Sequence, residues 1–186
     1  HVSKYDQLFI INKETKEIEK ILLTSKDDQV VDIPTVKDIN ADNVLELIFI
    51  TKLGYIYIYT LTLHPINKSL NSKLKVLKKE PYPLLYFHLL DVNEDGILDF
   101  ILIDNQCQLY CLDGQESLTL KKIIWSNINM MNIKHKIEYK PTIGDIDGNN
   151  ILDLVISTSH NYIYAIESKN GLLMNDFFPD RQIKET

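Results

Sequence analysis

The sequence repeats one aspartate-rich segment three times, and this repeat limits the possible folds more than any other feature. The segment "DINADNVLELIFIT" begins at Asp38, "DVNEDGILDFILID" at Asp91 and "DIDGNNILDLVIST" at Asp145. The three copies align without gaps, and their spacings are 91 − 38 = 53 and 145 − 91 = 54 residues. Repeats of this length indicate a series of similar supersecondary units, each packed against its neighbours.

The match between the copies extends beyond the acidic segments. A tyrosine stands 57 − 38 = 19 residues after each leading aspartate, at Tyr57, Tyr110 and Tyr164. The N-terminal stretch "QLFIINKETKEIEKILL" matches the later half of the unit, with Phe9 in the place of the tyrosine. We therefore predict the outer strands of a preceding unit in residues 1–28, followed by full units in residues 29–83, 84–138 and 139–186.

Each unit has the composition of short β-strands. The stretches "LELIFIT", "LDFILID" and "LDLVIST" are rich in β-branched and aromatic residues and are bounded by turn residues. The best helical pattern, around 116–135, is still interpreted as strand plus loop. A unit of about 50 residues with about four short strands has the size of a propeller blade. The predicted fold class is therefore all-β: a β-propeller segment of about three four-stranded blades plus half of a preceding blade.

Closed propellers typically have about 4 to 8 blades. Three and a half blades would leave two open edges, which can pair with other strands. We therefore expect the remaining blades to lie outside this sequence or to come from another chain.

The acidic segments have the side-chain chemistry of a metal-binding loop. Counting from each leading aspartate, oxygen-bearing side chains occupy positions 1, 3, 5 and 9 of all three loops. A chain wrapped around one point can also direct the carbonyl of position 7 inward. Such a set of hard oxygen ligands suits Ca²⁺, which takes 6 to 8 of them, better than Mg²⁺ or zinc. The candidate ligands are Asp38, Asn40, Asp42, Val44 and Glu46; Asp91, Asn93, Asp95, Ile97 and Asp99; and Asp145, Asp147, Asn149, Ile151 and Asp153.

Two details of the loops refine this prediction. Position 6 is Asn43, Gly96 or Asn150, the residue types that best tolerate a left-handed backbone conformation. An EF-hand would need a glutamate at position 12 and flanking helices, whereas apolar residues such as Phe49 stand at position 12 here. The loops are therefore not EF-hands, and the alternative of simple Asx-rich turns would not require four oxygen-bearing residues at a fixed spacing.

The stretches "DVNEDGILDF" and "DIDGNNILDL" resemble the calcium loops of FG-GAP/VCBS repeats, the blades of integrin-α-type β-propellers. The resemblance covers nearly the whole chain. It implies side-chain ligands at positions 1, 3, 5 and 9, a carbonyl ligand at position 7, and a loop that joins the first and second strands of each blade. The chain departs from the pattern in lacking the Phe-Gly and Gly-Ala-Pro tags and in having Glu46, Asn43 and Asn150. The second loop is nearest to the pattern, and the first departs from it most.

The resemblance implies a calcium-stabilised module for protein–protein or cell-surface interaction rather than an enzyme, with two or three structural Ca²⁺ ions. Weak calcium loops fill only at high calcium, which favours the secretory lumen, the cell surface or the extracellular space. A sequon at Asn67 is consistent with glycosylation there. The net charge of −6 argues against a nucleic-acid partner, and no apolar run is long enough to span a bilayer. The alternatives are a propeller enzyme or a carbohydrate-binding domain with its active face in other blades.

Several other residues could bear on these alternatives. Cys107 and Cys111 would lie about 13 Å apart on one strand face, too far for a disulfide, and are interpreted as small buried hydrophobes. The repeated tyrosines, together with Tyr55 and Tyr59, could line a sugar-binding or partner-binding face, but packing between blades is favoured. The histidines His64, His88, His135 and His160 show no catalytic spacing. Among the first strands of the units, only Lys37, His88 and Lys140 are ionisable, too few for a convincing active site.

Overall fold

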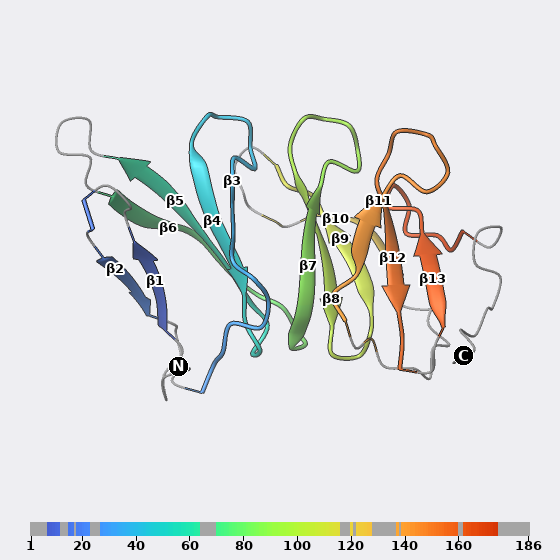
Figure 1. Cartoon of the computed structure of the whole chain (residues 1–186), viewed down its shortest axis with the longest axis horizontal. Helices are drawn as coiled ribbons and strands as arrows, with labels where there is room; N and C mark the ends of the chain where they lie inside the picture. Colours follow the sequence, from blue (N-terminus) through green and yellow to red (C-terminus); the bar gives the residue numbers. More distant parts are fainter. Residues whose placement is uncertain are drawn as a thin grey trace.

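The computed structural model describes residues 7–11, 15–16, 18–22, 27–63, 70–115, 120, 122–127, 137, 139–159 and 162–174. Its regular elements are all β-strands, arranged in four antiparallel sheets that follow one another along the chain (Figure 1). The all-β prediction is therefore confirmed. In the described part of the chain, no helix is long and apolar enough to cross a membrane. Asn67, His64, His135, His160 and much of 116–135 lie outside the described residues.

Within each sheet the strands pair in chain order, so every sheet is a meander. The N-terminal strand pair consists of β1 (Gln7–Ile11) and β2 (Ile18–Leu22). The first sheet contains β3 (Thr35–Lys37), β4 (Leu45–Ile50), β5 (Tyr55–Leu63) and β6 (Leu70–Lys79). The second contains β7 (Leu84–Leu90), β8 (Asp99–Asp104), β9 (Leu109–Leu112) and β10 (Ile123–Asn127). The third contains β11 (Thr142–Gly144), β12 (Asp153–Ser157) and β13 (Ile163–Ile166).

The apolar core lies between the sheets, because β4 and β8 are buried on both faces along nearly their whole length, whereas β12 alternates between buried and half-buried residues. On β4, Leu47 and Phe49 face the N-terminal strand pair, whereas Ile48 and Ile50 face the second sheet. Successive side chains of a strand point to opposite faces, so a continuous apolar run supplies two interfaces at once. This explains why the repeated strands are apolar throughout rather than alternating.

Two of the three repeated tyrosines belong to these interfaces, whereas Tyr164 is half-buried and stacks on Tyr162 with ring centroids 6.3 Å apart. Tyr57 is 1% exposed and stacks on Phe49 with ring centroids 4.7 Å apart. Tyr110 is half-buried and packs against the core between the first and second sheets. Tyr55 and Tyr59 pack against the cluster that contains Tyr57. This arrangement favours packing between sheets over an exposed sugar-binding face.

The two cysteines are free and buried, in keeping with their interpretation as small hydrophobes. Their predicted arrangement on one strand is wrong. Cys107 lies in the turn before β9 with φ of 60°, and only Cys111 belongs to that strand. The left-handed residue at Cys107 closes the turn between β8 and β9, which sequence periodicity alone does not reveal.

Candidate metal-binding loops

Each acidic loop connects the first strand of a sheet to the second, and the three loops lie at the same end of the sheets (Figure 1). The first loop is residues 38–46, the second 91–99 and the third 145–153. The first-to-second-strand connection is the one that the FG-GAP resemblance implies. The ninth residue of each loop already belongs to the second strand, so the rigid sheet holds it in place.

All three loops share one backbone conformation. Positions 4 and 6 have positive φ in every copy, with values between 58° and 86°. Position 6 was expected to be left-handed, but position 4 was not, because Ala41 and Glu94 are not typical of that conformation. A left-handed residue other than glycine costs on the order of 1 kcal/mol, so the surrounding hydrogen bonds must enforce it. The residues are Ala41 and Asn43, Glu94 and Gly96, and Gly148 and Asn150.

The leading aspartate organises each turn by accepting backbone amides. In the second loop, Oδ1 of Asp91 accepts the amide of Asp95 at 3.0 Å, and Oδ2 accepts the amide of Gly96 at 2.9 Å. Asp38 and Asp145 accept the amides of positions 5 and 6 in the same way, at 2.8 to 3.2 Å. These hydrogen bonds wrap each loop, from position 1 to position 6, around the carboxylate of its leading aspartate.

The position-5 side chain closes the turn through the amide of position 7. Oδ1 of Asp95 accepts the amide of Ile97 at 2.8 Å, and Asp42 and Asn149 accept the amides of Val44 and Ile151 at 2.8 and 2.7 Å. The position-7 residues therefore take part in each loop through their amides.

The asparagine in each loop donates to a neighbouring carboxylate. The amide Nδ2 of Asn93 lies 3.0 Å from Oδ2 of Asp95, and Asn40 contacts Asp42 at the same distance. In the third loop, Asn149 at position 5 donates to Asp147 at 3.0 Å. The N–H₂ groups partly compensate the negative charge of the carboxylates, as a bound cation would. A rotation of the side-chain amide would direct its oxygen toward the same point instead.

The ninth-position acids are Glu46, Asp99 and Asp153, and they are at most 1% exposed. Each accepts the amide of position 2 of its own loop, at 3.0 to 3.2 Å. Burial raises the pKa of all three carboxyl groups, these amide bonds partly offset the shift, and neighbouring loop carboxylates raise the pKa further. None of them forms an ion pair with a described lysine or arginine. Their negative charge is therefore poorly compensated by the protein itself.

The second and third loops differ at the other oxygen of the ninth-position acid. Oδ1 of Asp99 accepts the amide of Gly114 at 2.9 Å. Oδ1 of Asp153 is buried and has no hydrogen bond from any described residue, although the amide of Ser168 lies near enough to lower the pKa of Asp153. A buried oxygen without a donor is costly unless a ligand supplies the missing positive charge.

The third loop also gathers the most charge. One carboxylate oxygen from each of Asp145, Asp147 and Asp153 lies within 4.8 Å of the other two. Within the described ranges, no other group of three acidic, histidine or cysteine side chains comes this close together. Three hard anionic oxygens beside a buried unpaired one match the ligand preference of Ca²⁺. The sequence pattern ranks the second loop first, whereas the geometry fits a cation best in the third.

Gly114 and Ser168 lie next to the ninth-position acids, and the sequence analysis does not predict that they belong to these sites. Each follows its ninth-position acid by the same interval, 114 − 99 = 15 and 168 − 153 = 15 residues. A Cβ atom on Gly114 would lie 1.9 Å from the backbone oxygen of Leu98, so no larger residue fits there. The common interval was the signal that could have identified both positions.

The three ionisable residues of the inner strands also come together. Lys37, His88 and Lys140 line one cavity of about 170 Å³, with Thr35, Phe87 and Leu89 as the other lining residues. Strands β3 and β7 supply all but Lys140, which precedes β11. The repeat already singles out these three residues as the ionisable ones of the first strands, and the structure brings them to one cavity.

Comparison with solved structures shows the fold. The chain is similar to the crystal structure of the WD40 domain of SCAP from fission yeast, with a TM-score of 0.53 and 17% sequence identity over 91% of this chain. The chain spans 39% of that domain. No family model matches the sequence, and no curated protein matches it. The fold is therefore that of a β-propeller, of which this chain forms a segment, and the predicted unit boundaries at 28/29, 83/84 and 138/139 stay predictions.

Proposed function

We propose that this chain is a calcium-stabilised β-propeller segment of the FG-GAP type and that its role is binding to other proteins rather than catalysis. The observation that carries the proposal is the buried, unpartnered Oδ1 of Asp153 beside the carboxylates of Asp145 and Asp147. The same loop conformation in three copies supports a shared purpose for all of them.

The ion would act on stability. A third-loop ion would be held by Asp145, Asp147, Asn149 and Asp153 and would neutralise charge that burial makes unfavourable. Ca²⁺ is preferred because the donors are carboxylate and amide oxygens and Ca²⁺ accepts irregular ligand geometry, whereas Mg²⁺ requires a tighter octahedron. The same roles fall to Asp91, Asn93, Asp95 and Asp99, and to Asp38, Asn40, Asp42 and Glu46.

The proposed location follows from the ligand set. Extracellular calcium modules bind with Kd of about 10⁻⁴ to 10⁻³ M, so such loops fill in the secretory lumen, at the cell surface or outside the cell. A binding role, including cell adhesion, is consistent with the β-propeller fold, although the fold alone does not assign a function.

Calcium counting together with thermal unfolding tests the proposal. Native mass spectrometry of the chain in millimolar CaCl₂ should detect two or three bound ions, and the melting temperature should rise relative to EDTA. An unchanged melting temperature with no bound calcium would reduce the loops to hydrogen-bonded turns. MgCl₂ at the same concentration is the matched control, and it should give the smaller shift.

A further inference from the structure

The cavity between the inner strands is positively charged, although the whole chain carries a net charge of −6. Two lysines, Lys37 and Lys140, line it, and no acidic side chain does. The cavity lies where β3, β7 and the segment before β11 come side by side (Figure 1). Its volume of about 170 Å³ accommodates a carboxylate and its immediate neighbours.

Lys140 is fixed in place by two contacts. Its Nζ lies 2.7 Å from Oδ2 of Asp32 and 5.1 Å from the centre of the Phe87 ring. The side chain of Asp32 is only 4% exposed, and its Oδ2 also accepts the amide of Phe87 at 3.2 Å. Because Asp32 already compensates Lys140, the second lysine gives the cavity its net positive charge.

Lys37 supplies that uncompensated charge. It is exposed, and no acidic side chain among the described residues pairs with it. The neighbouring His88 is held by a 2.8 Å hydrogen bond from its Nε2 to the carbonyl of Pro141, which can only accept. Burial, followed by the charge of Lys140, lowers the pKa of His88, so its ring is a neutral, oriented wall of the cavity.

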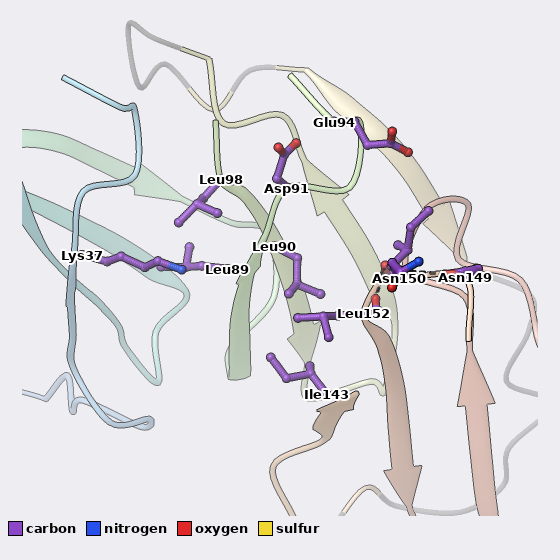
Figure 2. Close-up of a pocket in the computed structure, with 12 residues that line it drawn as sticks. Lys37, Leu89, Leu90, Asp91, Glu94, Leu98, Ile143, Asn149, Asn150 and Leu152 are labelled. Carbon is purple, nitrogen blue, oxygen red and sulfur yellow. Dashed lines mark hydrogen bonds between the residues drawn. The ribbon is translucent and has the colours of Figure 1, made fainter. Parts of the chain in front are cut away.

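A larger apolar cavity adjoins this site and shares Lys37 and Leu89 with it. Figure 2 shows Lys37 directed toward Leu89, with Leu90, Leu152 and Ile143 gathered beside them. The cavity measures about 540 Å³, within the range of ligand-binding sites. Its loop end carries the amides of Asn149 and Asn150 and the acids Asp91 and Glu94. Glu94 pairs with Lys169 at 3.0 Å, and Asp91 accepts the backbone amides of Asp95 and Gly96. The two cavities together present a lysine next to an apolar floor.

We propose that this inner-strand groove binds an acidic-apolar peptide segment of a protein partner, with a partner carboxylate at Lys37 and an adjoining apolar side chain on the floor formed by Leu89, Leu90, Ile143 and Leu152. Charge complementarity selects the occupant at the Lys37 end, because Lys37 has no acidic partner among the described residues and the leucine floor offers no charge, whereas Asp91 and Glu94 would repel a partner carboxylate at the loop end. The inference rests on the proposed binding role, since it names the surface and the class of partner. It is argued from Lys37 and the leucine floor, which are not calcium ligands, although Asp91 and Asn149 of the calcium loops also line the groove.

The test is an NMR titration of the ¹⁵N-labelled chain with an acetylated and amidated Leu-Glu-Leu tripeptide. We expect saturable shifts of the amides of residues 35–37 and 88–90. The Leu-Gln-Leu peptide should bind roughly threefold more weakly, as expected for loss of one solvent-accessible ion pair. Equal binding of the two peptides, or shifts scattered over the surface, would overturn the proposal.

Two lysine variants test whether Lys37 supplies the positive charge that binds the peptide carboxylate. Lys37→Met should weaken binding of Leu-Glu-Leu roughly threefold and leave Leu-Gln-Leu unchanged. Lys73→Met, which removes another exposed lysine, from the outer strand β6, should leave the binding of both peptides unchanged. Equal effects of the two variants would refute the assigned site. Titrations in millimolar CaCl₂ and in EDTA separate this result from the metal proposal, which fails only if calcium neither binds nor stabilises the chain.

Discussion

The Asp153→Asn substitution should change thermal stability in opposite directions with and without calcium. In EDTA, three loop carboxylates lie within 4.8 Å of one another, and Oδ1 of Asp153 is buried without a described donor. An asparagine removes one of the repelling charges and places an N–H₂ group where Oδ1 has no described hydrogen-bond donor. Its oxygen can still accept the amide of Ile146, which lies 3.1 Å from Oδ2 now. We therefore expect the variant to melt at a higher temperature than the unsubstituted chain in EDTA.

In calcium the order should reverse, because the variant loses an ion that the unsubstituted chain gains. A site with Kd of about 10⁻³ to 10⁻⁴ M at about 10 mM calcium contributes about 1.4 to 2.7 kcal/mol, from RT ln(1 + [L]/Kd). For a chain of this size, about 1 kcal/mol corresponds to roughly 2 to 4 °C. Loss of the third-loop ion should therefore reduce the calcium-induced rise in melting temperature by about 3 to 11 °C.

Differential scanning calorimetry in EDTA and in CaCl₂ measures both effects. The matched control is Asp99→Asn, at the same position of the second loop, where the two oxygens accept the amides of Val92 and Gly114. An asparagine there leaves one buried amide facing an N–H₂ group, so this variant should melt lower in EDTA. The reasoning is refuted if Asp153→Asn also melts lower in EDTA and its calcium-induced rise equals that of the unsubstituted chain.

Three further predictions concern the fold around the loops. Gly114→Ala should lower the melting temperature severely or prevent folding, because its Cβ would lie 1.9 Å from a backbone oxygen, whereas Gly144→Ala meets nothing within 4 Å and should be tolerated in the same assay. Trp125→Phe should cost about 1 to 3 kcal/mol in urea unfolding, because the carbonyl of Ser168 loses the buried indole N–H that lies 2.8 Å away, and an unchanged midpoint would contradict this role. In EDTA, melting temperature should fall as pH rises from about 4 toward neutrality, because the folded ninth-position acids have raised pKa values and hold protons that the unfolded chain has lost. The pKa of His88 is lowered, so His88 makes stability rise with pH below about 6.5. His88→Gln should therefore steepen the fall in melting temperature with pH. A flat profile in that variant would contradict the role given to the ninth-position acids.

The repeat predicted the sheets well because a strand that is buried on both faces has a nearly continuous run of apolar residues, which can be recognised in the sequence. The apolar strands after the ninth-position acids are β4, β8 and β12, and the polar loops before them occupy the predicted positions. The left-handed conformation at position 6 was also predictable, since Asn43, Gly96 and Asn150 favour it.

Other features depend on contacts that no single segment contains. Glu94 at position 4 becomes left-handed because Asp91 gathers the amides of the following residues, against the preference of glutamate itself. The turn at Cys107 shortens the expected strand for a comparable reason, since Asp104 accepts the amides of Gln106 and Gln108 at 2.8 and 3.0 Å. The repeat assigns Lys37, His88 and Lys140 to corresponding parts of the units, but the cavity that they share depends on how β3, β7 and the segment before β11 pack together.

Because the apolar clusters lie between the sheets, we expect this chain to unfold sheet by sheet rather than all at once. Among the described residues, the second sheet is covered by one cluster on each face, whereas the third sheet and the N-terminal strand pair each contribute to a single cluster. Stability in such an array is a sum of nearest-neighbour terms, so fraying starts at the ends and moves inward. Backbone amides of β8 and β9 should therefore exchange with deuterium last, and those of β1, β2 and β13 first.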